Sequence, residues 1–527
     1  MKNIKVLDVT LRDGGCVNNF NFGKFYMNKI LNALEDSTID YIELGYLDSK
    51  NGSEDERTQF INEKCIYHNF LINKKEKIKY LVMIDYGKFD IDNLEPCHKN
   101  GIDGIRFCFH KKDRFNAIPL IKRIIELGYD CFIQPMLTLR YTDEELIEFI
   151  NIVNTELFNC SGIYIVDSFG EMREPELKRL FKLFDDNLNK NITLGFHSHN
   201  NLQLSYSNAI NFINYPTSRN IMVDSSIMGM GKGAGNLNTE LLLEHLNLNT
   251  SSNYKIEPLL KVIDTVIKPL HTEYHWGYSI EFYLSSINHC TPSYASHYYN
   301  KHMLPINKIN SLLSLIDEEK KISFDKEYAE RIYQIYNENN QYDDSKTLES
   351  LSKKINGKKV LIIAPGKSIN SYTYEIISSS KDAVVISLNF EVPFIKSDYI
   401  LTTREDAFIS LNKNGNKLIV ASNILDNEKN NCYIINYKKW IEKQDDMIFD
   451  SSAVFSIKLA SYLKAKSIIL AGLDGFSTNI NDNYYSSSLR RGLNEREVSK
   501  RNIFYKDFIK KISKEVDIKF ITPSLYK

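Results

Sequence analysis

The first half of the chain repeats one pattern, a short apolar run followed by an amphipathic stretch, and this repeat most restricts the possible folds. Eight such runs, each bounded by turn residues, have the length and composition of β-strands. The stretches between them have helical spacing, as in Met27–Leu34 and Glu144–Val153. Eight successive βα units predict a TIM barrel with its active site at the carboxyl ends of the strands. The eight runs are Ile4–Val9, Tyr41–Tyr46, Ile78–Ile84, Gly104–Phe109, Cys131–Leu137, Gly162–Val166, Ile192–Phe196 and Ile221–Ile227.

The second half of the chain predicts two further parts, so we expect an α/β protein of three domains. Helical patterns rich in Tyr, His and Trp over 257–336 predict a lid or a subunit contact, or equally an aromatic helical core. Residues 337–354 are polar and typical of an interdomain linker. Strand-like runs then resume at Lys359 and predict a doubly wound α/β domain with a parallel sheet. The expected domains are a barrel at 1–250, a helical subdomain at 251–340 and an α/β domain at 355–527.

Charge and cysteine content exclude several classes of function. The 66 Lys and Arg residues nearly balance the 67 Asp and Glu residues, so neither nucleic acid nor an anionic membrane is an expected partner. The eight cysteines are scattered without a CxxC pair, which argues against a zinc ribbon and a disulfide framework. No signal segment or membrane-spanning apolar run is evident. We therefore expect a soluble cytoplasmic protein that acts on small molecules.

Two segments at the ends of predicted strands supply the donors of a divalent-metal site. Asp13 lies just after the first strand, and His197 and His199 belong to the seventh. Alternate residues of a strand point to the same face, so the two imidazoles would lie together. An isolated pair of this spacing is more often a surface or core feature, but Asp13 would complete a two-His, one-carboxylate set with open positions. Arg12, beside it, could neutralise negative charge that builds up on a substrate.

Other polar residues fall at the same ends of the predicted strands and are candidates for substrate binding. After the eighth strand, Gly229–Asn236 is a glycine-rich loop whose backbone N–H groups could hold a carboxylate or phosphate, with Gly231 and Gly233 as candidates. Such a loop can equally be only a tight turn. The side-chain candidates are Glu43, Arg106, Thr138 and Asp167.

Together, TLRDG at 10–14 and HSHNN at 197–201 resemble the DRE-TIM metallolyases, the HMGL-like (pyruvate carboxyltransferase domain) family. This family includes 4-hydroxy-2-oxoacid aldolases, hydroxymethylglutaryl-CoA lyase and isopropylmalate synthase. The likeness covers roughly residues 1–300 and is nearest to the 4-hydroxy-2-oxovalerate aldolases. Their helical domain carries a Gly-Tyr motif comparable to Gly277 and Tyr278 here.

The resemblance implies a role for each matching residue. Asp13, His197 and His199 would hold Mn²⁺ or Mg²⁺, and Arg12 would stabilise a pyruvate enolate. Asn236 matches a position that ligates metal in some lyases of the family.

One departure concerns proton transfer. The aldolases carry a catalytic histidine four residues after the arginine, where this chain has Cys16. A thiol is a poorer proton shuttle at neutral pH unless its pKa is shifted. Either Tyr278, His275 or a metal-bound water then takes the role, or the chemistry differs.

The C-terminal domain carries two turns that predict a binding site. Gly366-Lys367-Ser368 is not a Walker A motif, because Leu361 stands where the first glycine is required. With Gly472–Gly475 it faintly resembles the sialyltransferase-like and motility-accessory domains of bacterial surface-glycan pathways. Those transferases use a histidine base, and all eleven histidines here lie between 68 and 302. We therefore expect a nucleotide- or sugar-nucleotide-binding domain without its own transfer chemistry.

The favoured function is a divalent-metal aldolase or lyase that acts on a 2-oxo acid and an aldehyde, with a place in surface-glycan biosynthesis. A Claisen-type acyltransferase that joins an acyl-CoA to a 2-oxo acid is the alternative enzyme, and release of CoA thiol would distinguish the two. A non-catalytic metabolite-binding scaffold is the alternative from another class. The metal set and Arg12 argue against the scaffold, whereas Cys16 argues for it. We also expect a homo-oligomer.

Overall fold

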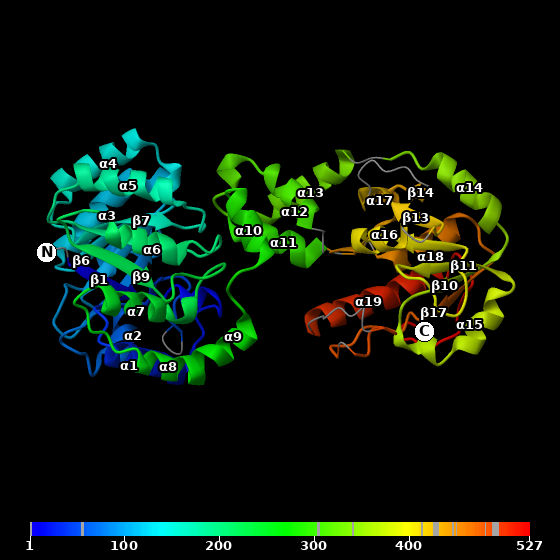
Figure 1. Ribbon diagram of the computed structural model, residues 1–527, viewed down its shortest axis with the longest axis horizontal. Helices are drawn as coiled ribbons and strands as arrows, with labels where there is room; N and C mark the ends of the chain where they lie inside the picture. The colour runs from blue at the N-terminus through cyan, green and yellow to red at the C-terminus, as the bar shows by residue number, and fades with distance from the viewer. Residues whose placement is uncertain are drawn as a thin grey trace. The chain divides into compact units, whose positions relative to one another are not determined.

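The computed structural model describes residues 3–53, 57–302, 306–339, 342–412, 415–424, 432–444, 447–449, 451–479, 481–486 and 495–527. The chain divides into two compact units, each with an apolar core of its own (Figure 1). The first contains 1–299 and 306–324, and the second contains 300–305 and 325–527. Within the described residues, no helix combines the length and apolar character needed to cross a membrane.

The first unit is built on a closed parallel barrel, which confirms the predicted fold. All eight predicted strands are present, with ends shifted by one or two residues. Leu7 of the first strand pairs with Asp224 on one side and Tyr41 on the other, and this double pairing closes the ring. A short ninth strand, β3 (Gln59–Phe60), extends the edge of β2. The barrel strands are β1 (Ile4–Asp8), β2 (Tyr41–Leu47), β4 (Lys79–Asp85), β5 (Gly104–Phe109), β6 (Asp130–Pro135), β7 (Gly162–Asp167), β8 (Thr193–Ser198) and β9 (Ile221–Ser225).

Helices surround the barrel and cover its outward-facing side chains (Figure 1). In β4, Val82 and Ile84 pack outward, while Leu81 belongs to the separate cluster inside the barrel. Two connections lack a long α-helix, namely the one between β2 and β4, whose α2 has four residues, and the one between β4 and β5. The segment between β4 and β5 forms only a three-residue 3-10 helix, because Asp, Asn and Pro interrupt any amphipathic period there. The surrounding helices are α1 (Gly23–Asp36), α2 (Glu63–Ile66), α3 (Arg114–Glu126), α4 (Asp143–Glu156), α5 (Glu174–Asn187), α6 (Ser205–Asn214) and α7 (Thr239–Asn249).

The helical region after the barrel is present, and its first helices share the barrel's core. Leu259 and Leu270 lie in the same apolar cluster as the barrel's outer residues. Ser286 donates a hydrogen bond to the Phe169 carbonyl at 2.6 Å and so ties the next helix to a loop at the barrel's carboxyl end. The last helix of the region belongs to the second unit. The helices are α8 (Glu257–Val262), α9 (Lys268–Tyr274), α10 (Ile280–Ile287), α11 (Pro292–His302), α12 (Ile306–Ser314) and α13 (Lys326–Asn339).

The second unit contains a parallel seven-stranded sheet, as predicted. Its strand order is β14-β13-β12-β11-β10-β17-β18, so the chain changes direction across the sheet between β10 and β17. The strands are β10 (Lys359–Ile363), β11 (Ala383–Leu388), β12 (Tyr399–Thr402), β13 (Leu418–Ala421), β14 (Cys432–Ile435), β17 (Ser467–Ala471) and β18 (Ile518–Phe520), with a separate hairpin of β15 (Glu442–Gln444) and β16 (Met447–Phe449). The helices are α14 (Ser345–Ile355), α15 (Thr373–Ser380), α16 (Glu405–Asn412), α17 (Tyr437–Trp440), α18 (Ser452–Tyr462) and α19 (Glu495–Ile512).

The predicted linker at 337–354 is not a linker over most of its length. It contains α14, whose Leu348, Leu351 and Ile355 are buried in the core of the second unit. These three apolar residues recur at helical spacing among polar ones, so a strongly polar composition concealed an amphipathic helix.

Candidate metal centre

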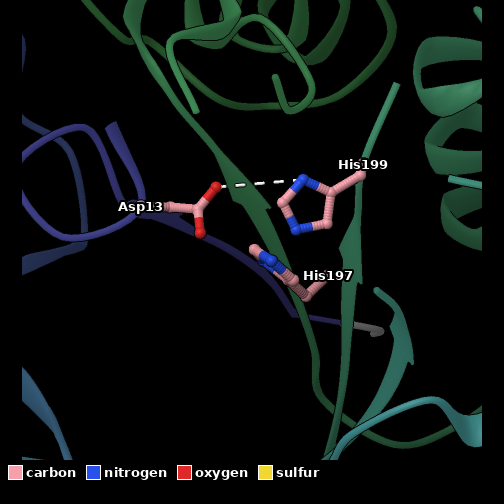
Figure 2. Close-up of side chains that lie close together, drawn as sticks. All are labelled: Asp13, His197 and His199. Carbon is pink, nitrogen blue, oxygen red and sulfur yellow. Dashed lines mark ion pairs between the residues drawn. The ribbon is translucent and has the colours of Figure 1, made fainter. Parts of the chain in front are cut away.

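Three side chains predicted as metal ligands lie together at the carboxyl end of the barrel (Figure 2). Asp13 sits in the turn after β1, where its N–H donates to the Val9 carbonyl at 2.8 Å. His197 lies in β8 and His199 directly after it, with ring centroids 5.2 Å apart. One potential ligand atom from each of the three residues lies within 4.8 Å of the others, and all three side chains are buried. Such a group could hold one ion.

Hydrogen bonds orient both imidazoles for metal binding. The Nδ1 atom of His197 lies 2.8 Å from Asp224 Oδ2, and Nδ1 of His199 lies 3.1 Å from the Lys232 carbonyl oxygen. A carboxylate and a carbonyl only accept, so each Nδ1 carries the proton and donates it. The Nε2 lone pairs of both rings are therefore available to a metal. Burial lowers the pKa of His199 to about 4, so this ring is neutral at physiological pH.

Asp13 is held as a carboxylate. Burial alone would raise its pKa, but the charge of Arg12 and a hydrogen bond from Asn236 bring the pKa well below its usual value. Arg12 Nη1 donates to Asp13 Oδ1 at 2.6 Å, and Asn236 Nδ2 donates to Asp13 Oδ2 at 2.6 Å. In Figure 2 the dashed line joins Asp13 Oδ2 to His199 Nδ1, 3.9 Å away.

The surroundings of Asn236 fit a cation. Its Oδ1 atom is buried and has no hydrogen-bond partner among the residues described. At Gly231, a Cβ atom would lie 2.2 Å from Asn236 Nδ2 and 2.6 Å from Asp13 Oδ2, so only glycine leaves this space open. Two imidazoles, a carboxylate and an unpaired amide oxygen form a donor set that suits Mn²⁺ or Mg²⁺. The residues present therefore fit the metal that the sequence predicts.

A chain of alternating charges lies beneath the three ligands. Arg12 Nε donates to Glu43 Oε2 at 2.6 Å, and Arg106 Nη1 donates to the same oxygen at 2.8 Å. Arg106 Nη2 in turn donates to Asp224, the carboxylate that orients His197. Glu43 and Arg106, predicted to bind substrate, thus contact each other and hold the residues around them.

Arg12 keeps one donor free. Its Nη2 atom is buried and has no partner among the described residues, whereas Nε and Nη1 are both bonded to carboxylates. The guanidinium carbon lies 5.8 Å from the centre of the Tyr46 ring. An unpaired buried donor costs free energy unless a ligand accepts from it, so Nη2 could donate to a ligand oxygen.

Two further predicted substrate residues bond within the barrel's own loops. Thr138 Oγ1 donates to the Pro135 carbonyl at 3.0 Å and accepts from Val166 N–H at 2.8 Å. Asp167 accepts from the N–H groups of Glu171 and Met172 at 2.9 and 3.1 Å. Neither side chain is hydrogen-bonded to Asp13, His197 or His199 in the part of the chain that the structure describes.

The glycine-rich loop closes over the ligands. The Lys232 N–H lies 3.3 Å from Asp13 Oδ2, and the Ala234 N–H donates to Asn201 Oδ1 at 2.8 Å. Gly233 has φ +69°, a conformation that a side chain would strain. The exposed Lys232 side chain extends from this loop.

The candidates for proton transfer lie in two places. Cys16 ends the 3-10 helix Gly14–Cys16, and burial raises its pKa to about 12, so it stays a thiol. His275 is exposed and its Nδ1 is bonded to the His271 carbonyl at 2.6 Å. Tyr278 is 59% exposed. Trp276 between them donates to the Met228 carbonyl at 3.0 Å, so their loop is bonded to the residue just before the glycine-rich loop. No hydrogen bond joins His275 or Tyr278 to a predicted metal ligand in the described chain.

Sequence reasoning missed Asp224. It lies in β9, where Ile221 and Val223 face the helices and Met222 lies inside the barrel. A carboxylate at an inward position of an otherwise apolar strand is the signal that could have identified it.

Comparisons with known proteins find relatives of the barrel half of the chain. The HMGL-like family model matches residues 3–266, about half of the chain. A 4-hydroxy-2-oxovalerate aldolase from Geobacillus thermodenitrificans is 24% identical over 270 residues, which are 51% of this chain and 77% of the relative. Another from Pelotomaculum thermopropionicum is 26% identical over 272 residues, 51% of this chain and 77% of that protein. The crystal structure of the N-terminal domain of a protein described as an aldolase, from Bacteroides vulgatus, is 28% identical with a TM-score of 0.50 and covers 58% of this chain and 98% of that one.

Proposed function

Because the chain belongs to the HMGL-like family, we propose that its barrel is a divalent-metal-dependent aldolase that acts on a 2-oxo acid. The chain is an enzyme of the carbon–carbon lyase class. The observation that carries the proposal is the buried group of Asp13, His197 and His199 beside the unpaired Nη2 of Arg12. Its curated relatives are aldolases, so the acyltransferase alternative is not favoured.

The proposed site divides its work between a metal and an arginine. A divalent ion held by Asp13, His197 and His199, with Asn236 as a further donor, would act as a Lewis acid that makes the C3 hydrogens of a 2-oxo acid more acidic. Arg12 Nη2 would donate to the substrate oxygen on which negative charge accumulates. Its guanidinium is already fixed by Glu43, so little reorganisation is needed when that charge forms.

The expected substrates are pyruvate and an aldehyde, or the 4-hydroxy-2-oxo acid that they form together. Purified full-length protein with Mn²⁺ should release pyruvate from 4-hydroxy-2-oxovalerate, and in reverse should join pyruvate to aldehydes from a panel analysed by mass spectrometry. Asp13→Asn should abolish both directions, whereas His98→Ala, which changes an exposed histidine, should have no effect. Wild-type protein inactive in both directions with every aldehyde and either metal would refute the proposal.

We also propose that the second unit binds a nucleotide or sugar nucleotide and that the aldolase acts in surface-glycan biosynthesis. Ligands of open parallel sheets bind where the strand order reverses, here at the ends of β10 and β17. The turns after these strands meet, because the Gly366 N–H donates to the Gly472 carbonyl at 2.9 Å and the Ser368 N–H donates to Asp474 at 2.8 Å. Titration of the full chain with cytidine, uridine and adenosine nucleotides by calorimetry tests this proposal, and Gly366→Val should prevent binding.

Domain independence and assembly are part of the same proposal. Because α13 and α14 belong to the second unit, fragments 1–324 and 325–527 should each fold, and the first should retain aldol cleavage. We propose a homo-oligomer, which light scattering of the full chain would detect as a mass above 61.2 kDa.

A further inference from the structure

A second polar pair lies inside the barrel and takes no part in the charge network beneath the metal ligands. Asp85 ends β4, and Cys108 lies in the neighbouring β5. In these strands Ile84 and Phe107 pack outward against the helices, so Asp85 and Cys108 face inward. Both positions are at the carboxyl end of the barrel, on the side formed by β4 and β5.

Cys108 holds Asp85 in a defined orientation. Its Sγ–H donates to Asp85 Oδ1 at 2.5 Å, and burial, with the nearby Asp85 charge, raises the pKa of the thiol well above its usual value. The thiol therefore remains a donor, and Asp85 Oδ2 is left as an acceptor. Unlike Glu43, Asp85 has no Lys or Arg ion pair among the described residues. Its side chain is partly exposed, so a ligand in the barrel mouth can reach it.

Asp85 faces the same space as Arg12. Tyr46 in the neighbouring β2 pairs with Met83 of β4, two residues before Asp85, and the Tyr46 ring lies 5.8 Å from the Arg12 guanidinium carbon. Asp85 is thus a carboxylate beside the proposed reaction centre that belongs neither to the metal ligands nor to an arginine pair.

The reaction proposed above requires such a group. Cleavage of a 4-hydroxy-2-oxo acid removes the proton of the C4 hydroxyl as the C3–C4 bond breaks. Cys16 is a thiol with a pKa of about 12, so it cannot serve as the acceptor near neutral pH. A carboxylate with a free oxygen can.

We propose that Asp85 is the catalytic base that accepts the C4 hydroxyl proton, with Cys108 as its positioning residue. This inference rests on the proposed aldolase function. The C4 O–H bond breaks and its proton passes to Asp85 Oδ2, while the C4 carbonyl forms. The electron pair of the C3–C4 bond becomes the C2–C3 double bond of the enolate. Solvent then protonates C3 to give pyruvate, and Asp85 releases its proton to solvent.

Two reactions that form the same enolate distinguish removal of the hydroxyl proton by Asp85 from the other proposed functions of the site. Decarboxylation of oxaloacetate forms the same pyruvate enolate but has no hydroxyl proton to remove. We expect Asp85→Asn to lower kcat for cleavage of 4-hydroxy-2-oxovalerate by about 10²- to 10³-fold. Decarboxylation by the same variant should stay within about threefold of wild type, since enolate stabilisation is intact.

Conservative and matched variants complete the experiment. Asp85→Glu keeps a carboxylate and should recover at least about tenfold of the cleavage lost in Asp85→Asn. Cys108→Ser keeps a donor and should cleave faster than Cys108→Ala. Asp90→Asn changes an exposed aspartate in the following loop and should affect neither reaction. If Asp85→Asn does not fold, Asp85→Ser provides the same comparison.

The outcomes distinguish failure of the proposed aldolase function from failure of the proposed role of Asp85. Wild-type protein that performs neither reaction overturns the aldolase proposal itself. Wild-type protein active in both, with Asp85→Asn lowering neither reaction or both equally, overturns only the role of Asp85. Equal cleavage by Asp85→Asn and Asp85→Glu would overturn it as well.

Discussion

One carboxylate oxygen, Oδ2 of Asp224, accepts hydrogen bonds from both His197 and Arg106. The distance to His197 Nδ1 is 2.8 Å. Burial would raise the pKa of Asp224, but the charge of Arg106 and the hydrogen bond from His197 lower it below its usual value. A single ionised group thus orients a proposed metal ligand and neutralises a fully buried arginine.

Asp224→Asn should weaken metal binding and folding together. The amide cannot hold the imidazole as firmly, so Mn²⁺ affinity measured by calorimetry should fall by about 10- to 100-fold. Arg106 also loses a buried charge partner, which typically costs about 3–5 kcal/mol in the free energy of unfolding. Urea denaturation measures the second effect. Unchanged Mn²⁺ affinity in a folded variant would contradict the orienting role of Asp224.

Replacing a proposed ligand should remove the metal site and leave the fold. His199→Ala and Asp13→Asn should show no Mn²⁺ binding by calorimetry or electron paramagnetic resonance. Without metal, His199→Ala should melt close to wild type, whereas Asp13→Asn should fold but melt at a lower temperature because Arg12 loses a buried charge partner. The exposed His98 provides the control, because His98→Ala should bind Mn²⁺ like the wild type. Retained stoichiometric binding in both ligand variants would show that the ion is held elsewhere.

Arg12→Lys should lower kcat far more than it raises KM. Lysine keeps the positive charge but lacks the fork that bonds Glu43 and Asp13 while leaving Nη2 for the substrate. We expect a loss of about 10²-fold in kcat for aldol cleavage. Arg123→Lys, on an exposed helix surface, is the matched control. A raised KM with unchanged kcat would instead assign Arg12 to anchoring the substrate carboxylate.

Gly231→Ala should inactivate the enzyme through crowding at the site. The added Cβ would lie 2.2 Å from Asn236 Nδ2 and would displace the side chain that bonds Asp13. Gly23→Ala is a useful comparison because that position has φ +72° and open space around it. It should lose about 1 kcal/mol of stability through backbone strain while its activity stays normal. Equal activity of the two variants would show that the glycine-rich loop tolerates a side chain.

Asp167 should make the barrel less stable as pH rises. Burial raises its pKa from 3.8 to about 7, so the folded state favours the protonated form. Its stabilising contribution is complete below about pH 4 and is lost as pH rises towards 7. Unfolding can be followed by Trp276 fluorescence after Trp440→Phe, because the chain has two tryptophans. The difference in unfolding free energy between wild type and Asp167→Asn should shrink with that slope between pH 4 and 7. A pH-independent difference would contradict the raised pKa.

The barrel and its proposed ligands could be predicted because their signals are local. Strand length, turn residues and a spacing of two between His197 and His199 are all visible in short windows. Figure 2 shows the two imidazoles on one side of β8, as the period of a strand requires.

The partners of these residues could not be predicted, because they depend on strand register. Arg106 and Asp224 meet only because β5 and β9 stand at corresponding heights in the ring, and nothing near either residue indicates the other. The pair of Asp85 and Cys108 is hidden for the same reason. The prediction of a linker at 337–354 was wrong for a different reason, since the polar face of α14 outweighed its three buried apolar residues.

The proposed donors come from opposite ends of the barrel sequence, Asp13 after the first strand and His197 in the seventh. Until β9 has been synthesised and has paired with β1, these side chains are not held together. An ion that binds only the closed ring shifts the equilibrium towards that ring. During synthesis on the ribosome, metal binding would therefore coincide with completion of the barrel. A chain truncated before β9 would leave the ribosome without the metal.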